Sequence, residues 1–558
     1  MRLFLRLILL VVGIYFALSF RLKYRLGRIT HRVRHTSRLP VGMPDGAILS
    51  TDLFEPIGGG PHPTLLMRLP YGRAGFTGIA TTYAHRGFNV VLQACRGTEE
   101  SGGTFNPLTN ERVDGLATLD WLRRQPWFDG RLGLTGPSYL GYAAWAIADA
   151  PEVAAIALKV SSSEFRSVVF PAGAFHLGLW LSWLQTMDGL SDALIFSVRM
   201  LLGDIERRTA RASLTLPLLE ADKAAVGHPV AFWREWFDTA IEDGPFWQAM
   251  DHRDRAATVA APVHLLGGWY DFMIEQLLAD YRRLVAAGRQ PWLTVSVSTH
   301  VSGGHEADNP VETLAWMRGH LLGQTEQIRR KPVAIEISGL GEWREFDSFP
   351  PGPPRLLTRF LNPGGSLAES RTAAIEPPSR YRYDPADPTP NLGGAIFAFT
   401  GAGPVNQRSL EARADTLCFT SEALDAPLTI IGNATATIFM RASVPYADLF
   451  VRLNDVDARG RSINICDGFL RTTPATPRDE NGVMQLELRL HATAHSFRRG
   501  HRLRLLVASG AHPRYARNLG TDEPAATATR LVANDIEIFH DHDHPAAITL
   551  PSYDVEGV

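Results

Sequence analysis

The sequence has few cysteines, no excess of charge and no internal repeat, and each absence argues against a class of protein. Three cysteines among 558 residues are too few and too scattered for a disulfide framework or a cysteine zinc site. The 56 basic and 58 acidic residues give a formal net charge of −2, so no nucleic-acid partner is indicated. Without repeats or long low-complexity runs, neither a solenoid nor a disordered chain is expected.

What is present is the composition of an ordinary globular protein. Hydrophobic residues make up 45% and charged residues 20% of the chain, so most of it should fold. Because 558 residues exceed what one hydrophobic core supports, we expect about three or four domains. The cysteines are expected to be buried free thiols, although Cys418 and Cys466 would pair if they met in space.

An apolar run from Leu7 to Phe20 stands apart near the start of the sequence. These fourteen residues follow Arg2 and Arg6, and six basic residues lie between positions 21 and 34. The length suits the h-region of a signal peptide, and Ala17-Leu18-Ser19 offers a cleavage site. However, the basic flank would resist translocation. We predict an uncleaved membrane anchor over residues 1–38, with a cleaved export signal as the alternative and the membrane face left open.

Short apolar strands alternate with helical patterns in the next part of the chain. Runs at 64–69, 88–93, 132–134 and 153–160 read as strands, and leucines at 116, 119 and 122 recur at a helical interval. The strand pattern stops between about 163 and 256, where leucine and tryptophan recur at helical spacing, and resumes at 263–266 and 293–297. This alternation indicates an α/β domain around a largely parallel sheet, interrupted by a helical insertion. Aromatic residues at helical spacing are typical of a core, so none in the insertion is assigned to binding.

After position 332 the pattern changes to short strands separated by turns rich in proline and glycine. Runs at 334–337, 435–440, 449–453 and 502–507 predict an all-β sandwich. A His-rich patch, His540-Asp541-His542-Asp543-His544, has the residue types of a metal site, but a solvated turn is the stronger interpretation.

The segment Gly136-Pro137-Ser138-Tyr139-Leu140-Gly141 has the pattern of a nucleophile elbow. It follows the short strand at 132–134 and leads into a helical pattern. Small neighbours allow the sharp turn that exposes a serine hydroxyl between a strand and a helix. An ordinary turn with a solvated Ser138 fits the same residues equally well, so the remainder of the chain decides between the two.

A nucleophilic serine needs a base and an acid that orients the base. In α/β hydrolases the acid and then the histidine follow the serine, each after a later strand. Asp271 follows the strand at 263–266, and His300 follows the strand at 293–297. His305, in the same loop as His300, is the alternative base. His264 lies inside a strand and His85 precedes Ser138, so both are poor candidates.

Acyl transfer also requires hydrogen-bond donors for the developing oxyanion. The backbone N–H of Tyr139 is one such donor, because it lies at the start of the helix and has no partner within it. The second should come from a loop after an early strand, where Tyr71 lies and where its hydroxyl is able to donate.

These motifs together resemble the CocE/NonD family, the group of cocaine esterase, α-amino-acid ester hydrolases and Xaa-Pro dipeptidyl-peptidases. The resemblance covers the chain from about residue 41 to the end. Its first half rests on Pro70-Tyr71, Arg96-Gly97, Ser101-Gly102-Gly103-Thr104-Phe105, Gln125-Pro126-Trp127, the elbow and Gly267-Gly268-Trp269-Tyr270-Asp271. Its second half rests on Glu342-Trp343-Arg344, Tyr383-Asp384-Pro385, Asp467-Gly468-Phe469 and the segment from Thr493 to Leu503.

The resemblance implies the fold, the domains and the site. The fold is an α/β-hydrolase domain with a helical cap insertion, followed by a jelly-roll sandwich. The hydrolase domain is expected over 39–162 and 257–328, the cap over 163–256, and a dipeptidyl-peptidase-like jelly roll over 329–558. The implied triad is Ser138, Asp271 and His300, with Tyr71 and Tyr139 as the oxyanion hole.

The sequence departs from the family pattern at two places. The family usually has Gln-Asp-x-Arg-Gly where this chain has Gln93-Ala94-Cys95-Arg96-Gly97, and we interpret the missing aspartate as structural. The family commonly has Gly-Pro-Trp-x-His where this chain has Val297-Ser298-Thr299-His300, so the loop that holds the imidazole differs.

Three functions are compatible with the sequence. The first is a serine hydrolase that cleaves a carboxylic ester through an acyl-enzyme, with no metal or organic cofactor. Phe272-Met273-Ile274 follow Asp271, and the first carboxylate is Glu275, which argues against an α-amino acyl substrate. The second is a dipeptidyl-peptidase that takes a short peptide and holds its amine with residues of the insertion. The third is a non-catalytic, membrane-tethered binding protein. The natural substrate and the oligomeric state stay open.

Overall fold

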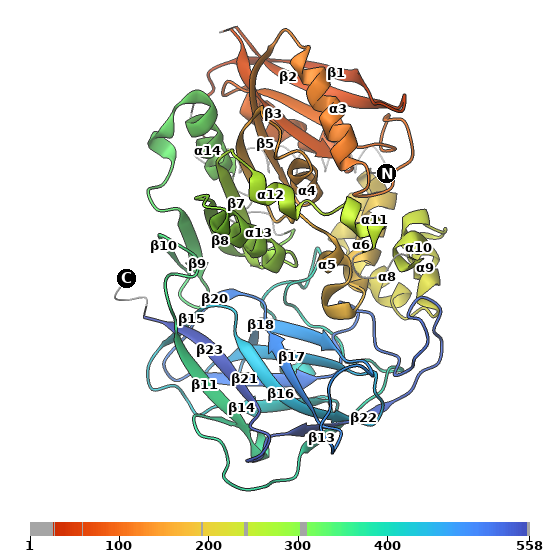
Figure 1. The fold of residues 1–558 in the computed structure, drawn as a ribbon, viewed down its shortest axis with the longest axis vertical. Helices are drawn as coiled ribbons and strands as arrows, with labels where there is room; N and C mark the ends of the chain where they lie inside the picture. Colours follow the sequence, from red (N-terminus) through yellow and green to blue (C-terminus); the bar gives the residue numbers. More distant parts are fainter. Residues whose placement is uncertain are drawn as a thin grey trace.

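The computed structural model describes residues 26, 28–58, 60–190, 193–238, 244–301 and 310–554. An α/β domain occupies the upper part of Figure 1, a β domain occupies the lower part, and the cap helices lie at the right between them. This arrangement confirms the predicted fold class.

In the described chain, ten strands form the sheet of the α/β domain in the order β1-β2-β4-β3-β5-β6-β7-β8-β9-β10. The strands from β4 to β9 run parallel to their neighbours, whereas β1, β2 and β10 pair antiparallel at the two ends. The ten strands are β1 (Arg32–Gly42), β2 (Ile48–Ile57), β3 (His62–Leu69), β4 (Asn89–Ala94), β5 (Phe128–Pro137), β6 (Val153–Lys159), β7 (Val263–Tyr270), β8 (Trp292–Thr299), β9 (Val333–Ile337) and β10 (Glu342–Phe346).

Helices cover both faces of this sheet, because parallel strands need crossover connections. Alternate residues of β3 enter separate cores: Leu66 packs in the core with α3 (Glu111–Arg123) and α13 (Ile274–Ala286). Leu65 and Met67 pack on the opposite face, in the core with α2 (Thr77–Ala84) and α14 (Pro310–Leu322). The strands are therefore buried on both faces, which explains their continuous apolar runs.

The cap is built from short helices between β6 and β7, as predicted. Trp180, Trp183, Trp233 and Trp236 pack together in its core, which also includes Tyr139 and so reaches the elbow. The helices are α5 (Arg166–Val169), α6 (Leu177–Gly189), α7 (Ala193–Leu201), α8 (Asp204–Ala212), α9 (Ala221–Val226), α10 (Ala231–Asp238), α11 (Pro245–Ala249) and α12 (Arg253–Thr258).

The β domain contains thirteen strands among the residues that the structure describes. Several alternate apolar and polar residues, as in β19, where every second side chain is buried. The strands are β11 (Arg355–Asn362), β12 (Ser366–Ala368), β13 (Ser379–Tyr383), β14 (Thr416–Thr420), β15 (Leu428–Gly432), β16 (Thr435–Ala442), β17 (Asp448–Val456), β18 (Ser462–Arg471), β19 (Met484–Arg489), β20 (Thr493–Phe497), β21 (Arg502–Ala508), β22 (Asn534–Phe539) and β23 (Ala547–Tyr553).

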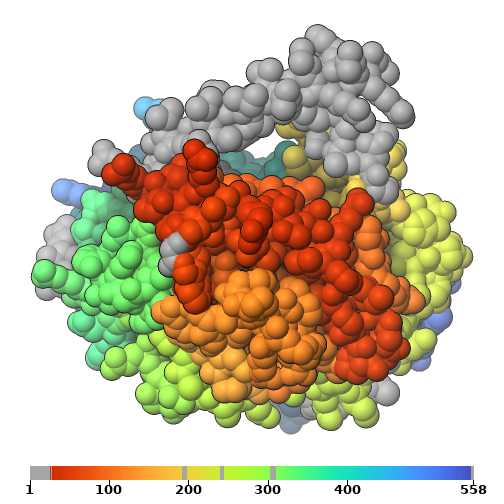
Figure 2. Space-filling model, turned by 90° about the horizontal axis from the view of Figure 1, so that it is seen from above, coloured from red at the N-terminus to blue at the C-terminus, as the bar shows by residue number. Residues whose placement is uncertain are grey.

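Two segments lie in other elements than the sequence predicts. The segment at 334–344 is predicted in the sandwich, but it forms β9 and the first part of β10 in the hydrolase sheet. There β9 pairs parallel with β8, and β10 pairs antiparallel with β9. A short apolar strand has the same pattern in both kinds of sheet, so the pattern could not separate them. Arg32 and Arg34, predicted in the flank of the anchor, begin β1 and pair with β2. The red residues of Figure 2, which include β1 and β2, form much of the described surface in that view.

Other predictions concern residues outside the catalytic elements. The three cysteines are free, so Cys418 and Cys466 do not pair. In the patch at 540–544, His544 Nδ1 lies 3.0 Å from Asp541 Oδ1, and no group suited to a metal ion occurs among the described residues.

No helix in the described part of the chain is long and apolar enough to cross a membrane. The apolar run at 7–20 lies outside the described residues.

Candidate active site

Ser138 lies at the turn between β5 and α4 (Tyr139–Trp145), with φ 56° and ψ −122°. This conformation costs a non-glycine residue about 1–3 kcal/mol and occurs at functional sites. Two glycines allow the turn to pack: a Cβ on Gly136 would lie 2.4 Å from Leu140 Cβ, and one on Gly141 would lie 2.4 Å from Ser161 Cβ. The elbow pattern is thus explained by close packing around the strained serine.

His300 and Asp271 lie beside Ser138 at the carboxyl end of the sheet. His300 Nε2 is 2.9 Å from Ser138 Oγ, and His300 Nδ1 is 2.6 Å from Asp271 Oδ2. Asp271 Oδ1 also accepts the backbone N–H of Met273 at 2.6 Å, which fixes the carboxylate. The structure therefore brings the three residues into one hydrogen-bonded chain. His305, the alternative base, lies outside the described residues.

The segment before His300 differs from the usual family pattern, yet it is held firmly. The Val297 backbone N–H donates to Glu336 Oε2 at 2.7 Å, and the Ser298 and Ser296 hydroxyls are 2.9 Å apart. Ser298 packs so closely against β7 that a Cβ on Gly268 would lie 2.3 Å from Ser298 Oγ. These contacts fix the segment before His300, where this chain lacks the usual Gly-Pro-Trp pattern of the family.

Two phenylalanine rings contact the imidazole of His300. The Phe272 ring centroid is 4.3 Å from that of His300, and the Phe397 centroid is 5.6 Å away in an edge arrangement. Phe397 comes from the β domain, in a loop fixed by Arg452, which donates to Leu392 O at 2.6 Å and Asn391 Oδ1 at 3.0 Å. The β domain therefore contributes directly to the site.

Two donors point toward the reacting serine. Tyr71 is partly buried. Loss of hydration raises the pKa of its hydroxyl to about 12, while hydrogen bonds with Trp183 and Ser138 act in the opposite direction. The phenol is thus protonated and able to donate throughout the pH range of a folded protein. The backbone N–H of Tyr139 is in the first turn of α4, where it donates to no described group. The Tyr139 side chain takes another role, because its hydroxyl donates to Glu111 Oε1 at 2.8 Å.

The other histidines weighed as bases lie elsewhere. His264 is buried in β7, with Nε2 2.9 Å from Thr294 Oγ1, and burial lowers its pKa. The His85 ring contacts His31 O at 2.8 Å.

The pocket at Ser138 is narrow and almost entirely apolar. Its lining contains no aspartate or glutamate, and its free volume is about 20 Å³. That volume holds about one water molecule, so side chains of the wall must move for an acyl group to enter. The lining residues are Tyr71, Pro107, Leu108, Ser138, Tyr139, Phe165, Leu179, Trp180, Trp183, Phe272, Met273, His300 and Phe397.

Trp183 and Phe397 are site residues that the sequence reasoning did not find. Trp183 Nε1 donates to the Tyr71 hydroxyl oxygen at 3.1 Å. Its helical spacing is that of a core residue, and it is indeed part of the cap core, so no local signal distinguishes it. Phe397 lies in a loop more than two hundred residues after Ser138, and the sequence carries no sign that this loop reaches the site.

A strained serine at an elbow, hydrogen-bonded to a histidine–aspartate pair on an α/β-hydrolase fold, defines a serine hydrolase. Two family models match the chain: X-Pro dipeptidyl-peptidase (S15 family) over 45–302, and the X-Pro dipeptidyl-peptidase C-terminal non-catalytic domain over 320–548. The chain belongs to the CocE/NonD family of serine hydrolases. The interpretation as a non-catalytic binding protein is therefore wrong.

Relatives in this family include esterases and peptidases. Cocaine esterase of Rhodococcus sp. (strain MB1 Bresler) is 29% identical to this chain, over 92% of this chain and 98% of the esterase. A solved α-amino-acid ester hydrolase is 19% identical, with a TM-score of 0.79 over 94% of this chain and 98% of its own. An aminopeptidase of a marine-sediment Thaumarchaeota archaeon is 20% identical, with a TM-score of 0.78 over 93% of this chain and 96% of its own. At these identities the two structures show the shared fold.

Proposed function

We propose that the enzyme hydrolyses carboxylic esters that carry an apolar acyl group, with Ser138, His300 and Asp271 as its triad. The observation that carries the substrate preference is the apolar wall around Ser138, which includes Phe165, Trp180 and Phe272 but no carboxylate. An acyl group with a free ammonium would lose its hydration there and gain no ion pair in return.

The reaction follows from the hydrogen-bonded chain of the three residues. Nε2 of His300 accepts the proton of the Ser138 hydroxyl as Oγ attacks the ester carbonyl carbon. Asp271 accepts the N–H of His300 Nδ1, so it selects the tautomer with a free Nε2 and stabilises the imidazolium that forms. His300 then gives the proton to the leaving alcohol. A water molecule, deprotonated by His300, releases the acid from Ser138.

The oxyanion of each tetrahedral intermediate is stabilised by the Tyr71 hydroxyl and the Tyr139 backbone N–H. Trp183 contributes indirectly as a positioning residue. The indole N–H of Trp183 donates to the Tyr71 oxygen. Because Tyr71 accepts from Trp183 on that side, its O–H is directed toward Ser138.

Glu275 is engaged elsewhere, which supports an ester without an α-amino group. Glu275, the first carboxylate after Asp271, accepts Asn433 Nδ2 at 2.8 Å and the Ala492 backbone N–H at 2.6 Å. It therefore fastens α13 to the β domain. The match to the S15 peptidase model keeps dipeptidyl-peptidase activity as the second candidate.

Two esters that differ by one ammonium group test this preference. We expect kcat/KM for p-nitrophenyl phenylacetate to exceed that for the p-nitrophenyl ester of phenylglycine by about a hundredfold or more, because the ammonium would be desolvated without a partner. Gly-Pro p-nitroanilide should be cleaved far more slowly than either ester. Steady-state rates measure all three. Comparable rates for the two esters would contradict the acyl preference, and faster cleavage of the anilide would favour the dipeptidyl-peptidase.

Removal of the Tyr71 hydroxyl tests the oxyanion hole. We expect Tyr71→Phe to lower kcat by about 10²–10³-fold with little change in KM, because the lost hydrogen bond forms fully only in the transition state. Trp183→Phe should lower kcat less, and it should have almost no further effect when combined with Tyr71→Phe. Additive effects of the two substitutions would contradict the positioning role of Trp183.

We also propose that the apolar run at 7–20 anchors the enzyme to a membrane, with the cleaved export signal as the alternative. The support is the apolar run with its basic flank. When the full chain is expressed, it should stay in the membrane fraction after alkaline carbonate extraction, and its N-terminal peptide should be intact by mass spectrometry. Release by carbonate would contradict the anchor, and a new N-terminus after about position 19 would favour export.

A further inference from the structure

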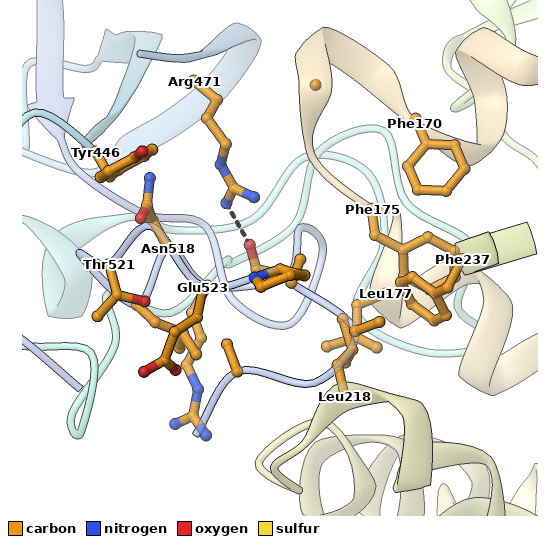
Figure 3. A pocket seen from close by; sticks show the side chains of 18 of the residues that line it. Phe170, Phe175, Leu177, Leu218, Phe237, Tyr446, Arg471, Asn518, Thr521 and Glu523 are labelled. Carbon is orange, nitrogen blue, oxygen red and sulfur yellow. Dashed lines mark hydrogen bonds between the residues drawn. The ribbon is translucent and has the colours of Figure 1, made fainter. Parts of the chain in front are cut away.

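A second cavity, with a volume of about 490 Å³, lies between the cap and the β domain (Figure 3). It shares no lining residue with the pocket at Ser138. Its volume falls within the roughly 300–1,000 Å³ that is typical of small-molecule sites. The cavity is therefore large enough to bind a compact organic ligand, independently of the catalytic pocket.

The cap side of this cavity is a wall of aromatic rings. Phe175 packs against Phe170, with ring centroids 5.4 Å apart, and against Phe237, at 4.7 Å. Leu177 and Leu218 extend the apolar surface beside these rings (Figure 3). A wall of this kind binds the hydrocarbon part of a ligand, because burial removes apolar area from water.

The β-domain side offers hydrogen-bond donors that the protein leaves unused. Arg471 is fixed by Asp448, with Nε–Oδ1 and Nη2–Oδ2 distances of 2.8 Å, and its Nη2 also donates to Ala516 O at 2.6 Å. Its Nη1 donates to no group among the described residues, and 17% of the side chain is exposed. The hydroxyls of Tyr446 and Thr521 also line the cavity and, within the described chain, have no hydrogen-bond partner. Figure 3 shows these three side chains across the cavity from the phenylalanine rings.

The carboxylates that line the cavity already have partners. Glu523 accepts the backbone N–H groups of Thr529 and Arg530 at 3.2 and 3.4 Å, and the Arg530 Nε at 3.3 Å. The Asp522 side chain is 75% exposed and pairs with Arg530 at 3.5 Å. Arg517, a further cation of the lining, donates to the carbonyl oxygens of Pro385 and Leu214. The groups left for a ligand are thus mainly donors.

We propose that this cavity binds a small carboxylic acid in its ionised form, with the hydrocarbon body against Phe170, Phe175 and Phe237. The carboxylate oxygens accept from Arg471 Nη1 and from the hydroxyls of Tyr446 and Thr521. A ligand of this class satisfies both walls, because ionised acceptors make the stronger hydrogen bonds with a guanidinium. A neutral alcohol would satisfy the aromatic wall but offer the donors a single uncharged oxygen, and a short acid such as propionate would satisfy only the donors.

Calorimetric titration of the full-length enzyme with three probes tests this proposal. We expect 3-phenylpropionate to bind with one-to-one stoichiometry, and 3-phenylpropanol and propionate to bind about tenfold or more weakly, since the alcohol lacks the charged second oxygen and propionate lacks the hydrocarbon body. Failure to detect binding of 3-phenylpropionate at millimolar concentration, or equal affinity for the alcohol, would overturn the proposal.

Variants of the cavity locate the binding. Ala526, in the segment between β21 and β22, lines the cavity. Ala526→Trp should fill the cavity and abolish binding, while ester hydrolysis shows that the variant is folded. Tyr446→Phe combined with Thr521→Val keeps the shape of the lining and removes two donors, so affinity for 3-phenylpropionate should fall several-fold and affinity for 3-phenylpropanol should not. Unchanged binding of 3-phenylpropionate to both variants would place it elsewhere and overturn the proposal.

Discussion

Replacement of Ser138 with alanine is expected to lower kcat for a p-nitrophenyl ester by about 10⁵-fold or more, with KM changed little. The hydroxyl is the group that forms the acyl-enzyme, and His300 lies 2.9 Å from its oxygen. The residual rate should reflect only the oxyanion donors and substrate binding. Steady-state kinetics with carefully purified variant measure the effect.

The folding of Ser138→Ala is the control for this substitution, because alanine leaves the backbone strain at position 138 unchanged. Alanine keeps a Cβ at φ 56°, so Ser138→Ala should fold with the wild-type melting temperature and circular dichroism spectrum. A well-folded Ser138→Ala variant that retained more than about a hundredth of the wild-type kcat would contradict the role of Ser138 as nucleophile.

Replacement of Asp271 with asparagine is expected to lower kcat by about 10⁴-fold at neutral pH. An asparagine amide would donate to Nδ1 of His300, across the 2.6 Å contact that the carboxylate now makes, and would place the proton on Nε2. His300 would then be unable to accept the proton of Ser138. Steady-state rates, with KM as the check on binding, measure the loss.

Glu275→Gln is the matched control for Asp271→Asn. It also neutralises a carboxylate at the start of α13, but this carboxylate contacts Asn433 and Ala492 in the β domain. It should therefore lower stability more than kcat. A similar kcat loss in both variants would show that charge near the site matters in general, and would contradict a specific role for Asp271.

The chemistry of the site could be predicted because it follows chain order. Neighbouring parallel strands end at the same edge of a sheet, and β7 and β8 are adjacent to each other and follow β6 beside β5. Ser138, Asp271 and His300 each follow one of these strands, so their sequence positions imply their meeting. The role of Gly136 and Gly141 could also be predicted from the local sequence, because a tight turn needs small residues beside the serine.

The walls of the site could not be predicted, because they depend on contacts between distant parts of the chain. Trp183 reaches Tyr71 from the cap, and Phe397 reaches His300 from the β domain. Likewise, the pattern of residues 333–337 predicts a buried strand but not the sheet to which it belongs. Only its pairing with β8 shows that it belongs to the hydrolase sheet. Local patterns thus predict elements and strand-end residues, while substrate-contacting side chains depend on tertiary packing.

Labelling with a fluorophosphonate tests the central claim most directly, because the reagent captures an activated serine without assuming any substrate. The account predicts one covalent adduct per chain, mapped by mass spectrometry to Ser138, and no adduct in Ser138→Ala. Asp271→Asn should be labelled far more slowly than wild type. No labelling of the folded enzyme, or an adduct on another residue that persists in Ser138→Ala, would contradict the account.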